Sequence, residues 1–209
     1  MKQKRFFGKQ KVGLTNRDII KSISYSQQEM IKWIMYLYCP YGFDLDVTYS
    51  KGNFYKGLIE PKIKMDITPI KKDVIKSDAK FIPIKDTTLS SIMFDPPFII
   101  GGTSKSKIKS RFDSFSDCQS LYNLYYLVIS ESFRILKAKG IFVFKCQDGG
   151  GGKCEWAHLD IINYATNIGF IMKDLFVLLA KNRLIRQITQ TKARKYHSYF
   201  LVFEKEKGN

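Results

Sequence analysis

Apolar residues recur along the sequence with two different periods, and these periods predict where helices and strands lie. Between Ser26 and Pro40 they return every three or four positions, which predicts a helix. Ser26, followed three residues later by Glu29, forms a capping box at the start of that helix. The same period predicts helices over 121–137 and 155–167. Alternating or continuous apolar runs predict strands over 43–49, 62–67, 90–94, 141–145, 170–179 and 197–204.

The order of these elements predicts the architecture. Strands alternate with helices over most of the chain, which indicates an α/β fold with a mostly parallel sheet and helices on both faces. The last two strands have no full helix between them and are expected to form an antiparallel edge. A length of 209 residues fits a single domain, 1–209, without a separate target-recognition domain. Ligands of such sheets bind beyond the carboxyl ends of the strands, so the turns after Tyr49 and Phe94 should lie on one rim.

Charge narrows the expected partners. The sequence carries a formal net charge of +16, and lysine and arginine displace the counterions that condense on nucleic-acid phosphates. A nucleic acid is therefore the favoured partner, with a solvated lysine-rich surface as the alternative. Two basic loops, 99–120 and 181–197, are candidates for contact with nucleic acid, and the basic N-terminal arm, 1–21, is expected to be either a mobile arm or a surface layer. The residues expected to touch nucleic acid are Lys105, Lys107, Lys109, Arg111, Arg183, Arg186, Arg194, Lys195 and His197.

Cysteine usage and hydropathy exclude several classes of protein. The four cysteines form no CxxC pair, so we expect reduced thiols in a cytoplasmic protein. Cys146, Cys154 and His158 are irregularly spaced and lack a fourth ligand, so no metal site is expected. No apolar stretch approaches the length of a membrane span, and no apolar region follows the basic N-terminus, so neither a membrane protein nor a signal peptide is expected. A hydrophobic content of 44% excludes a disordered chain.

The segment Asp95-Pro96-Pro97-Phe98 directly follows the apolar strand predicted over 90–94. An acidic residue, two prolines and an aromatic residue form a motif typical of enzymes that methylate planar amino groups. An exocyclic base amine is a poor nucleophile, because its lone pair is delocalised into the ring. The Asp95 carboxylate and the Pro96 carbonyl can accept its two hydrogens and stabilise the positive charge that develops on the nitrogen. Phe98 can stack on a base flipped out of the duplex. The alternative is a rigid turn that only ends the strand.

A second group of candidates begins at the strand predicted over 43–49. An acidic residue near a strand end, followed by a turn with a glycine, suits an amino acid and a nucleoside, and Gly52 permits close backbone approach. Asp66 could hold ribose hydroxyls, and Asp78 could accept from an adenine amine. Each acidic residue could instead be a capping or solvated side chain. The candidate cofactor-binding residues are Asp46, Thr48, Lys51, Gly52, Asp66 and Asp78.

The chain from about Ser24 to Lys205 resembles small phage and prophage-type DNA methyltransferases of the amino-methylating group. The resemblance is carried by residues 46–55, 94–98, 145–148, 174–178 and 193–203. It implies a Rossmann-like class I methyltransferase fold, S-adenosylmethionine as the methyl donor and no metal. It also implies that Asp46 and Gly52 lie in the cofactor site and that residues 95–98 form the methyl-transfer centre. The cofactor turn of that family has two glycines, and here Ser50 stands where the first is expected.

Together these features predict methyl transfer from S-adenosylmethionine to the exocyclic amine of a base in DNA. Adenine is favoured over cytosine, because the resemblance associates Asp at the first position of the motif with adenine. Two alternatives remain: an RNA base methyltransferase, and a non-catalytic nucleic-acid-binding module of the same fold. The intact Asp95 and Phe98 speak against the second alternative. The patterns predict neither an oligomeric state nor a recognition sequence.

Overall fold

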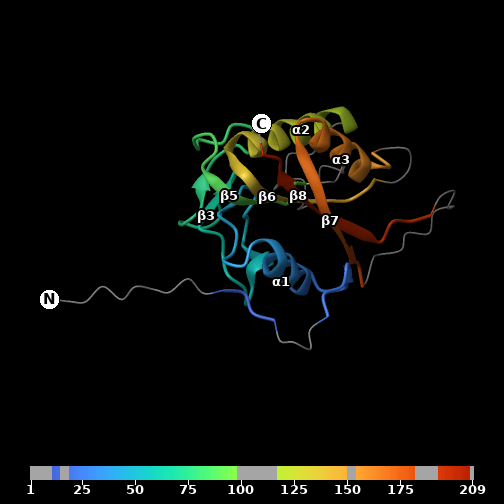
Figure 1. Ribbon diagram of the computed structural model, residues 1–209. Coiled ribbons are helices and arrows are strands. Elements are labelled where there is room, and N and C mark those ends of the chain that lie inside the picture. The colour runs from blue at the N-terminus through green and yellow to red at the C-terminus, as the bar shows by residue number, and fades with distance from the viewer. Residues whose placement is uncertain (1–10, 15–18, 98–116, 150–153, 182–192, 208–209) are drawn as a thin grey trace.

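A computed structural model describes residues 11–14, 19–97, 117–149, 154–181 and 193–207 of the chain (Figure 1). The centre of this described part is an eight-stranded sheet with the strand order β1-β7-β8-β6-β5-β2-β3-β4. In chain order the strands are β1 (Ile23–Ser24), β2 (Leu45–Asp46), β3 (Ile63–Asp66), β4 (Ile75–Lys76), β5 (Leu89–Phe94), β6 (Leu136–Cys146), β7 (Phe170–Leu179) and β8 (His197–Lys205).

The sheet is mostly parallel, as the sequence predicts. Every described pair of neighbours is parallel except those that involve β8. β8 runs antiparallel to β6 on one side and to β7 on the other, and the two-residue β1 forms the edge beyond β7. The carboxyl ends of β2, β3, β5 and β6 therefore lie at one rim of the sheet, together with the start of β8.

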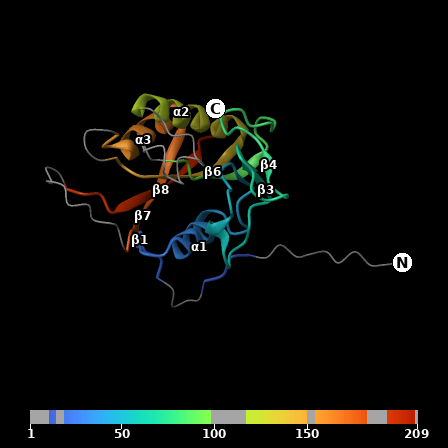
Figure 2. The same ribbon diagram turned by 180° about the vertical axis from the view of Figure 1, so that it is seen from behind.

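Helices cover both faces of the sheet. α1 (Gln27–Tyr38) lies on one face, and α2 (Cys118–Ile135) and α3 (Ala157–Asn167) lie on the other (Figures 1 and 2). Each face of the sheet packs against a hydrophobic core, and successive residues of β6 contribute to the two cores in turn. Val143 packs in the cluster that holds Met30 of α1, and Phe144 packs in the cluster that holds Tyr125 of α2. A strand covered on both faces is apolar at successive positions, as β6 is from Ile141 to Phe144.

The longer elements agree with the sequence-based predictions and the shorter ones differ. The helix predicted after Ser26 is confirmed, and the Ser26 hydroxyl accepts a hydrogen bond from the backbone N–H of Glu29 at 3.3 Å. α2 begins before the predicted position 121, because the Asp117 carboxylate accepts from the N–H of Ser120 at 2.8 Å and caps the helix there. The strand predicted over 43–49 is reduced to β2. β1 and β4 were not predicted, because two residues are too few to show a period.

Cys118 and Cys154 form a disulfide that joins the start of α2 to the segment before α3, with 5.7 Å between their Cα atoms. The expectation of reduced thiols is therefore wrong for this pair, because the fold brings together residues 36 positions apart. Cys39 and Cys146 are free and buried. Within the described ranges, no group of three or more His, Cys, Asp or Glu side chains could hold a metal ion. No helix in those ranges is long and apolar enough to cross a membrane.

Candidate active site

Three acidic side chains meet where the central strands end. Asp46 and Asp66 are the last residues of β2 and β3, and Asp95 comes directly after β5. β2 pairs in parallel with both β3 and β5, so the three ends lie side by side. Thr48, after β2, accepts a hydrogen bond from the backbone N–H of Asp95 at 2.8 Å. The expectation that the turns after Tyr49 and Phe94 share one rim is confirmed by this contact.

Asp46 is buried and hydrogen-bonded on both carboxylate oxygens. One oxygen accepts from the N–H of Thr48 at 2.8 Å, and the other accepts from the hydroxyl of Tyr55 at 2.7 Å. Tyr55 belongs to a short 3-10 helix, η1 (Asn53–Tyr55), that the sequence patterns did not predict. Burial, reinforced by the negative charges of Asp95 and Asp66, raises the pKa of Asp46 to about 7.

Asp95 offers a buried acceptor with room for a further donor. Apart from an ion pair with Lys145, its Oδ1 atom receives no hydrogen bond of ordinary geometry from the described residues. The nearest compensating charge is the ammonium of Lys145, which lies 3.2 Å from Oδ1 as an ion pair. Burial raises the pKa of the Asp95 carboxyl, and the Lys145 charge opposes that rise. A buried carboxylate oxygen without a hydrogen bond of ordinary geometry is unusual, because such groups are costly to leave unpaired.

Two cavities adjoin this centre. The larger, of about 400 Å³, is lined by Thr48, Asp66, Asp78 and Asp95 together with residues of α2. The smaller, of about 150 Å³, is lined by Asp46, Thr48, Lys51 and Asp95 together with residues of η1. Thr48 and Asp95 line both cavities, so the two form one elongated site with Asp95 at the junction. Five of the six predicted cofactor residues line it.

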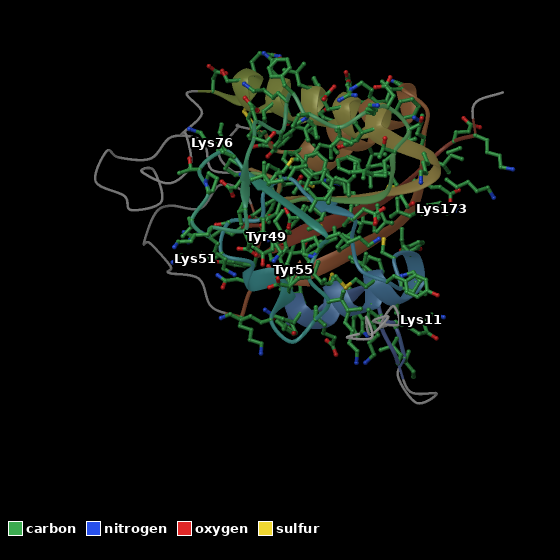
Figure 3. All side chains as sticks on the ribbon, turned by 90° about the vertical axis from the view of Figure 1, so that its left-hand side faces the viewer. Lys11, Tyr49, Lys51, Tyr55, Lys76 and Lys173 are labelled. Carbon is green, nitrogen blue, oxygen red and sulfur yellow. A yellow bond between two sulfur atoms is a disulfide. The ribbon has the colours of Figure 1, made fainter. Side chains whose placement is uncertain are left out.

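Gly52, the sixth, lines neither cavity. It adopts φ +70°, and a Cβ there would lie 2.3 Å from the Tyr49 hydroxyl oxygen. Glycine is therefore required by the backbone and by the Tyr49 ring, which stacks on Tyr55 (Figure 3). Ser50, which stands where a glycine was expected, also has a left-handed backbone with φ +50°, and its N–H donates to Asp66 at 2.8 Å.

Part of the predicted methyl-transfer motif can be placed. Pro96 is buried. Pro97 lines the larger cavity, and its carbonyl accepts a hydrogen bond from the Tyr125 hydroxyl at 3.2 Å. Phe98 lies outside the described residues.

Lys145 belongs to the segment 145–148 that carries the resemblance, but the sequence patterns assigned it no role in the site. It precedes the last residue of β6, is 7% exposed and reaches the α1 side of the sheet. A signal was present, because Lys145 continues the alternate positions of Ile141 and Val143, whose side chains are buried. A lysine at such a position is almost never left unpaired.

The predicted nucleic-acid contacts are only partly placed. Arg194, Lys195 and His197 belong to the described residues and come just before or at the start of β8, at the rim where β6 ends. Lys195 lies 3.5 Å from the Asp148 carboxylate and 4.3 Å from the Trp156 ring centroid. Nε2 of His197 lies 2.7 Å from the hydroxyl oxygen of Tyr199. The other predicted contacts, Lys105, Lys107, Lys109, Arg111, Arg183 and Arg186, lie outside the described residues.

Comparison with solved structures identifies the fold. TrmN from Thermus thermophilus matches with 12% identity and a TM-score of 0.52 over 85% of this chain and 48% of its own. A structure described as a complex between the Haloferax volcanii Trm112 methyltransferase activator and "the putative methyltransferase" matches with 12% identity and a TM-score of 0.51. That match covers 79% of this chain and 82% of the other.

A Thermus thermophilus protein described as "Putative DNA Modification Methylase" was crystallised with S-adenosylmethionine. It matches with 16% identity and a TM-score of 0.45 over 64% of this chain. The match spans 55% of that methylase, about half its length. No protein-family model and no curated protein matches the sequence. The strand order and the first two likenesses give this chain the Rossmann-like fold of class I, S-adenosylmethionine-dependent methyltransferases.

Proposed function

We propose that this protein transfers a methyl group from S-adenosylmethionine to the exocyclic amine of a nucleic-acid base, with adenine in DNA as the favoured target. The observation that carries the proposal is the buried Asp95 Oδ1 atom, which is ion-paired with Lys145 at 3.2 Å and lies on a residue that lines both cavities. An amine that donates to this oxygen would satisfy it and be oriented by it.

The elongated site fits the two halves of the donor. The larger cavity offers carboxylates at Asp66 and Asp78, which can accept from ribose hydroxyls and from the adenine amine. The smaller cavity offers Lys51, whose charge matches the carboxylate of the methionine part, and Asp46, whose carboxyl group would be ionised by a nearby ammonium. Thr48 and Asp95, which line both cavities, would then lie between the residues that hold the two halves of the donor. Together the residues present are consistent with S-adenosylmethionine, and they would supply binding and orientation.

The chain's own groups act on the amine. The Asp95 carboxylate and the Pro96 carbonyl accept its two hydrogens, so the nitrogen lone pair is directed at the methyl carbon. As the carbon–nitrogen bond forms, the sulfur–carbon bond breaks and its electron pair stays on sulfur. Positive charge develops on the nitrogen and is stabilised by the adjacent carboxylate until the proton leaves. Phe98 stacks on the base that carries the amine.

Three features guide the choice of substrate. The net charge of +16 and the two basic segments, 99–120 directly after the motif and 181–197 before the last strand, favour a nucleic acid, and the resemblance to enzymes that methylate DNA favours DNA among nucleic acids. The adenine preference rests on Asp at position 95 within that resemblance. One domain, 1–209, would then perform both binding and transfer.

Transfer of tritium from labelled S-adenosylmethionine to DNA, RNA and protein tests the proposal. We expect incorporation into DNA, and N6-methyladenine on nucleoside analysis. N4-methylcytosine would move the target to cytosine, and label in RNA alone would establish the RNA alternative. Binding of nucleic acid without transfer to any of the three would leave a non-catalytic binding module and refute the proposal.

A further inference from the structure

Lys145 places a positive charge beside the proposed acceptor. Its ammonium lies 3.2 Å from Asp95 Oδ1 and 3.2 Å from the side-chain oxygen of Gln27, at the start of α1. It also lies 4.7 Å from the ring centroid of Phe54 and 5.7 Å from that of Phe200. Residues of α1, η1 and β8, together with the residue directly after β5, therefore converge on one ammonium group carried by β6.

These surroundings fix where the ammonium sits. Two aromatic rings attract the cation, and the Gln27 oxygen accepts from it, so its position is set without the carboxylate. A lysine side chain usually carries about 2 kcal/mol of rotamer entropy, and these contacts restrict that freedom for Lys145. A cation held in this way gives the neighbouring carboxylate a fixed partner and a preferred orientation.

We propose that Lys145 is a positioning residue, which keeps the Asp95 carboxylate ionised and directed at the point where the amine arrives. The inference deepens the proposed function and rests on it. An ionised carboxylate has only acceptor sites, whereas a protonated one also carries an O–H donor and would compete with the amine hydrogens. Lys145 acts through Asp95 and has no step of its own in the transfer.

The other groups that face Asp95 do not replace this cation. Asp46 of β2 is acidic and its pKa is raised in part by the charge of Asp95, so it supplies no positive charge. Tyr55 of η1 and Tyr125 of α2 both feel the Asp95 charge, and burial raises the pKa of each well above its usual value, so neither supplies a positive charge. Thr48 contributes a hydroxyl that accepts from the backbone of Asp95. Among the described groups around Asp95, the ammonium of Lys145 is thus the charge that favours ionisation of the Asp95 carboxyl.

The direct test is to titrate Asp95 by NMR in protein labelled with carbon-13 at the aspartate carboxyl. The Asp95 signal is assigned by its absence from Asp95→Asn. Lys145→Met removes the charge and keeps the length, Lys145→Arg keeps the charge, and Lys173→Met is the control because Lys173 is paired with Glu204 instead. We expect Asp95 to titrate at least about one pH unit higher in Lys145→Met than in the wild type, and near the wild-type position in the other two. If Lys145→Met does not fold, Lys145→Gln decides in its place.

Single-turnover transfer at saturating donor gives the second readout. Because removal of the cation raises the pKa of Asp95, transfer by Lys145→Met should fall further at the pH where Asp95 titrates than well above it. We expect a loss of about tenfold to a hundredfold at the lower pH, typical of a misplaced contact, and recovery in Lys145→Arg.

An Asp95 signal that titrates alike with and without the Lys145 charge would overturn the inference. The inference would also be overturned if Lys145→Met bound S-adenosylmethionine about tenfold more weakly while Asp95 titrated as in the wild type. Lys145 would then bind the methyl donor directly. The titration needs no substrate. If the wild-type protein methylates no nucleic acid, the proposed function is refuted. The titration would still show whether the Lys145 charge lowers the pKa of Asp95.

Discussion

Gly52 shows how a single residue shapes the candidate site without lining either cavity. A Cβ at this position would meet the Tyr49 ring, and the backbone is left-handed. A left-handed backbone costs an ordinary residue about 1–2 kcal/mol. Gly52→Ala should therefore lower the free energy of unfolding by more than this amount. It should also disturb the Tyr49–Tyr55 stack, whose ring centroids are 5.8 Å apart, and with it the Tyr55 hydrogen bond to Asp46.

Gly57 supplies the matched control. It has nearly the same backbone, with φ +75°, and a Cβ there would meet no atom within 4 Å. Gly57→Ala should cost only the backbone term, about 1–2 kcal/mol. Urea unfolding of both variants separates the two contributions. Equal losses of unfolding free energy in the two variants would show that the Tyr49 ring moves aside at no cost and that its contact does not destabilise Gly52→Ala.

Asp46 gives a pH-dependent prediction. Its pKa is raised from 3.8 to about 7, so between these values the folded protein holds a proton that the unfolded chain has released. Stability contributed by this group therefore falls as pH rises through that window. Asp46→Asn does not ionise, so it should gain stability relative to the wild type between pH 4 and 7. The difference should level off above pH 7 at up to about 4 kcal/mol. Urea unfolding at pH 5, 6, 7 and 8 measures it, and a difference independent of pH would show that Asp46 titrates normally.

The first turns of helix α2 form a wall of the larger cavity. Ser120, Asn123, Leu124 and Leu127 line it, and their spacing follows the helix period. Ser120→Phe should fill the space proposed for the nucleoside. We expect donor affinity to fall about tenfold or more, equivalent to a loss of about 1.4 kcal/mol, with little change in thermal stability.

Gln119→Phe is the control for this wall, because Gln119 is the neighbouring exposed residue and does not line the cavity. Calorimetric titration with S-adenosylmethionine compares the two variants. If Ser120→Phe binds the donor as the wild type does, the cavity beside α2 is not the nucleoside site.

The elements show what periodicity can predict. β7 matches its predicted bounds at Phe170 and Leu179 because ten residues contain five repeats of the strand period. The 3-10 helix η1 has three residues and follows a left-handed glycine, so it carries no periodic signal. The Cys118–Cys154 disulfide depends on how α2 and the segment before α3 meet, which no local pattern contains.

The residues of the candidate site also fall into those that the sequence predicts and those that depend on the folded structure. Asp46, Asp66 and Asp95 were predicted because parallel strands end at one rim, and a residue directly after such a strand reaches it. The role of Gly52 in accommodating Tyr49 was not predictable, because that contact arises within a folded turn. Lys145 was predictable in principle, because it interrupts an apolar strand that is buried on both faces.

The charge of the whole molecule leads to a prediction about salt. If Lys105, Lys107 and Lys109 contact phosphates, log affinity for DNA should fall linearly with log salt, by about 0.9 for each phosphate contacted. Replacing all three lysines with glutamine should reduce that slope by about 1 to 3 units. Fluorescence anisotropy with a labelled duplex at several salt concentrations measures it.

A second triple variant controls for the loss of net charge. Lys137, Lys139 and Lys173 lie toward the amino ends of β6 and β7, away from the rim that carries Asp95. Lys173 lies on the far side of the molecule from Lys51 and Lys76 (Figure 3). Replacing these three with glutamine removes the same charge and should leave the slope nearly unchanged. Equal slopes for the two triple variants would mean that the segment 99–120 makes no specific phosphate contacts.

The central claim is that Asp95 orients and stabilises the amine during methyl transfer. The most direct test is the single-turnover rate of DNA methylation by Asp95→Ala at saturating S-adenosylmethionine. We predict a rate about a hundredfold to a thousandfold below that of the wild type, because a preorganised electrostatic contact with the reacting group is lost. Donor affinity should change little, since the proposed contacts to the nucleoside are made by Asp66 and Asp78. Methylation by Asp95→Ala at the wild-type rate would contradict the account.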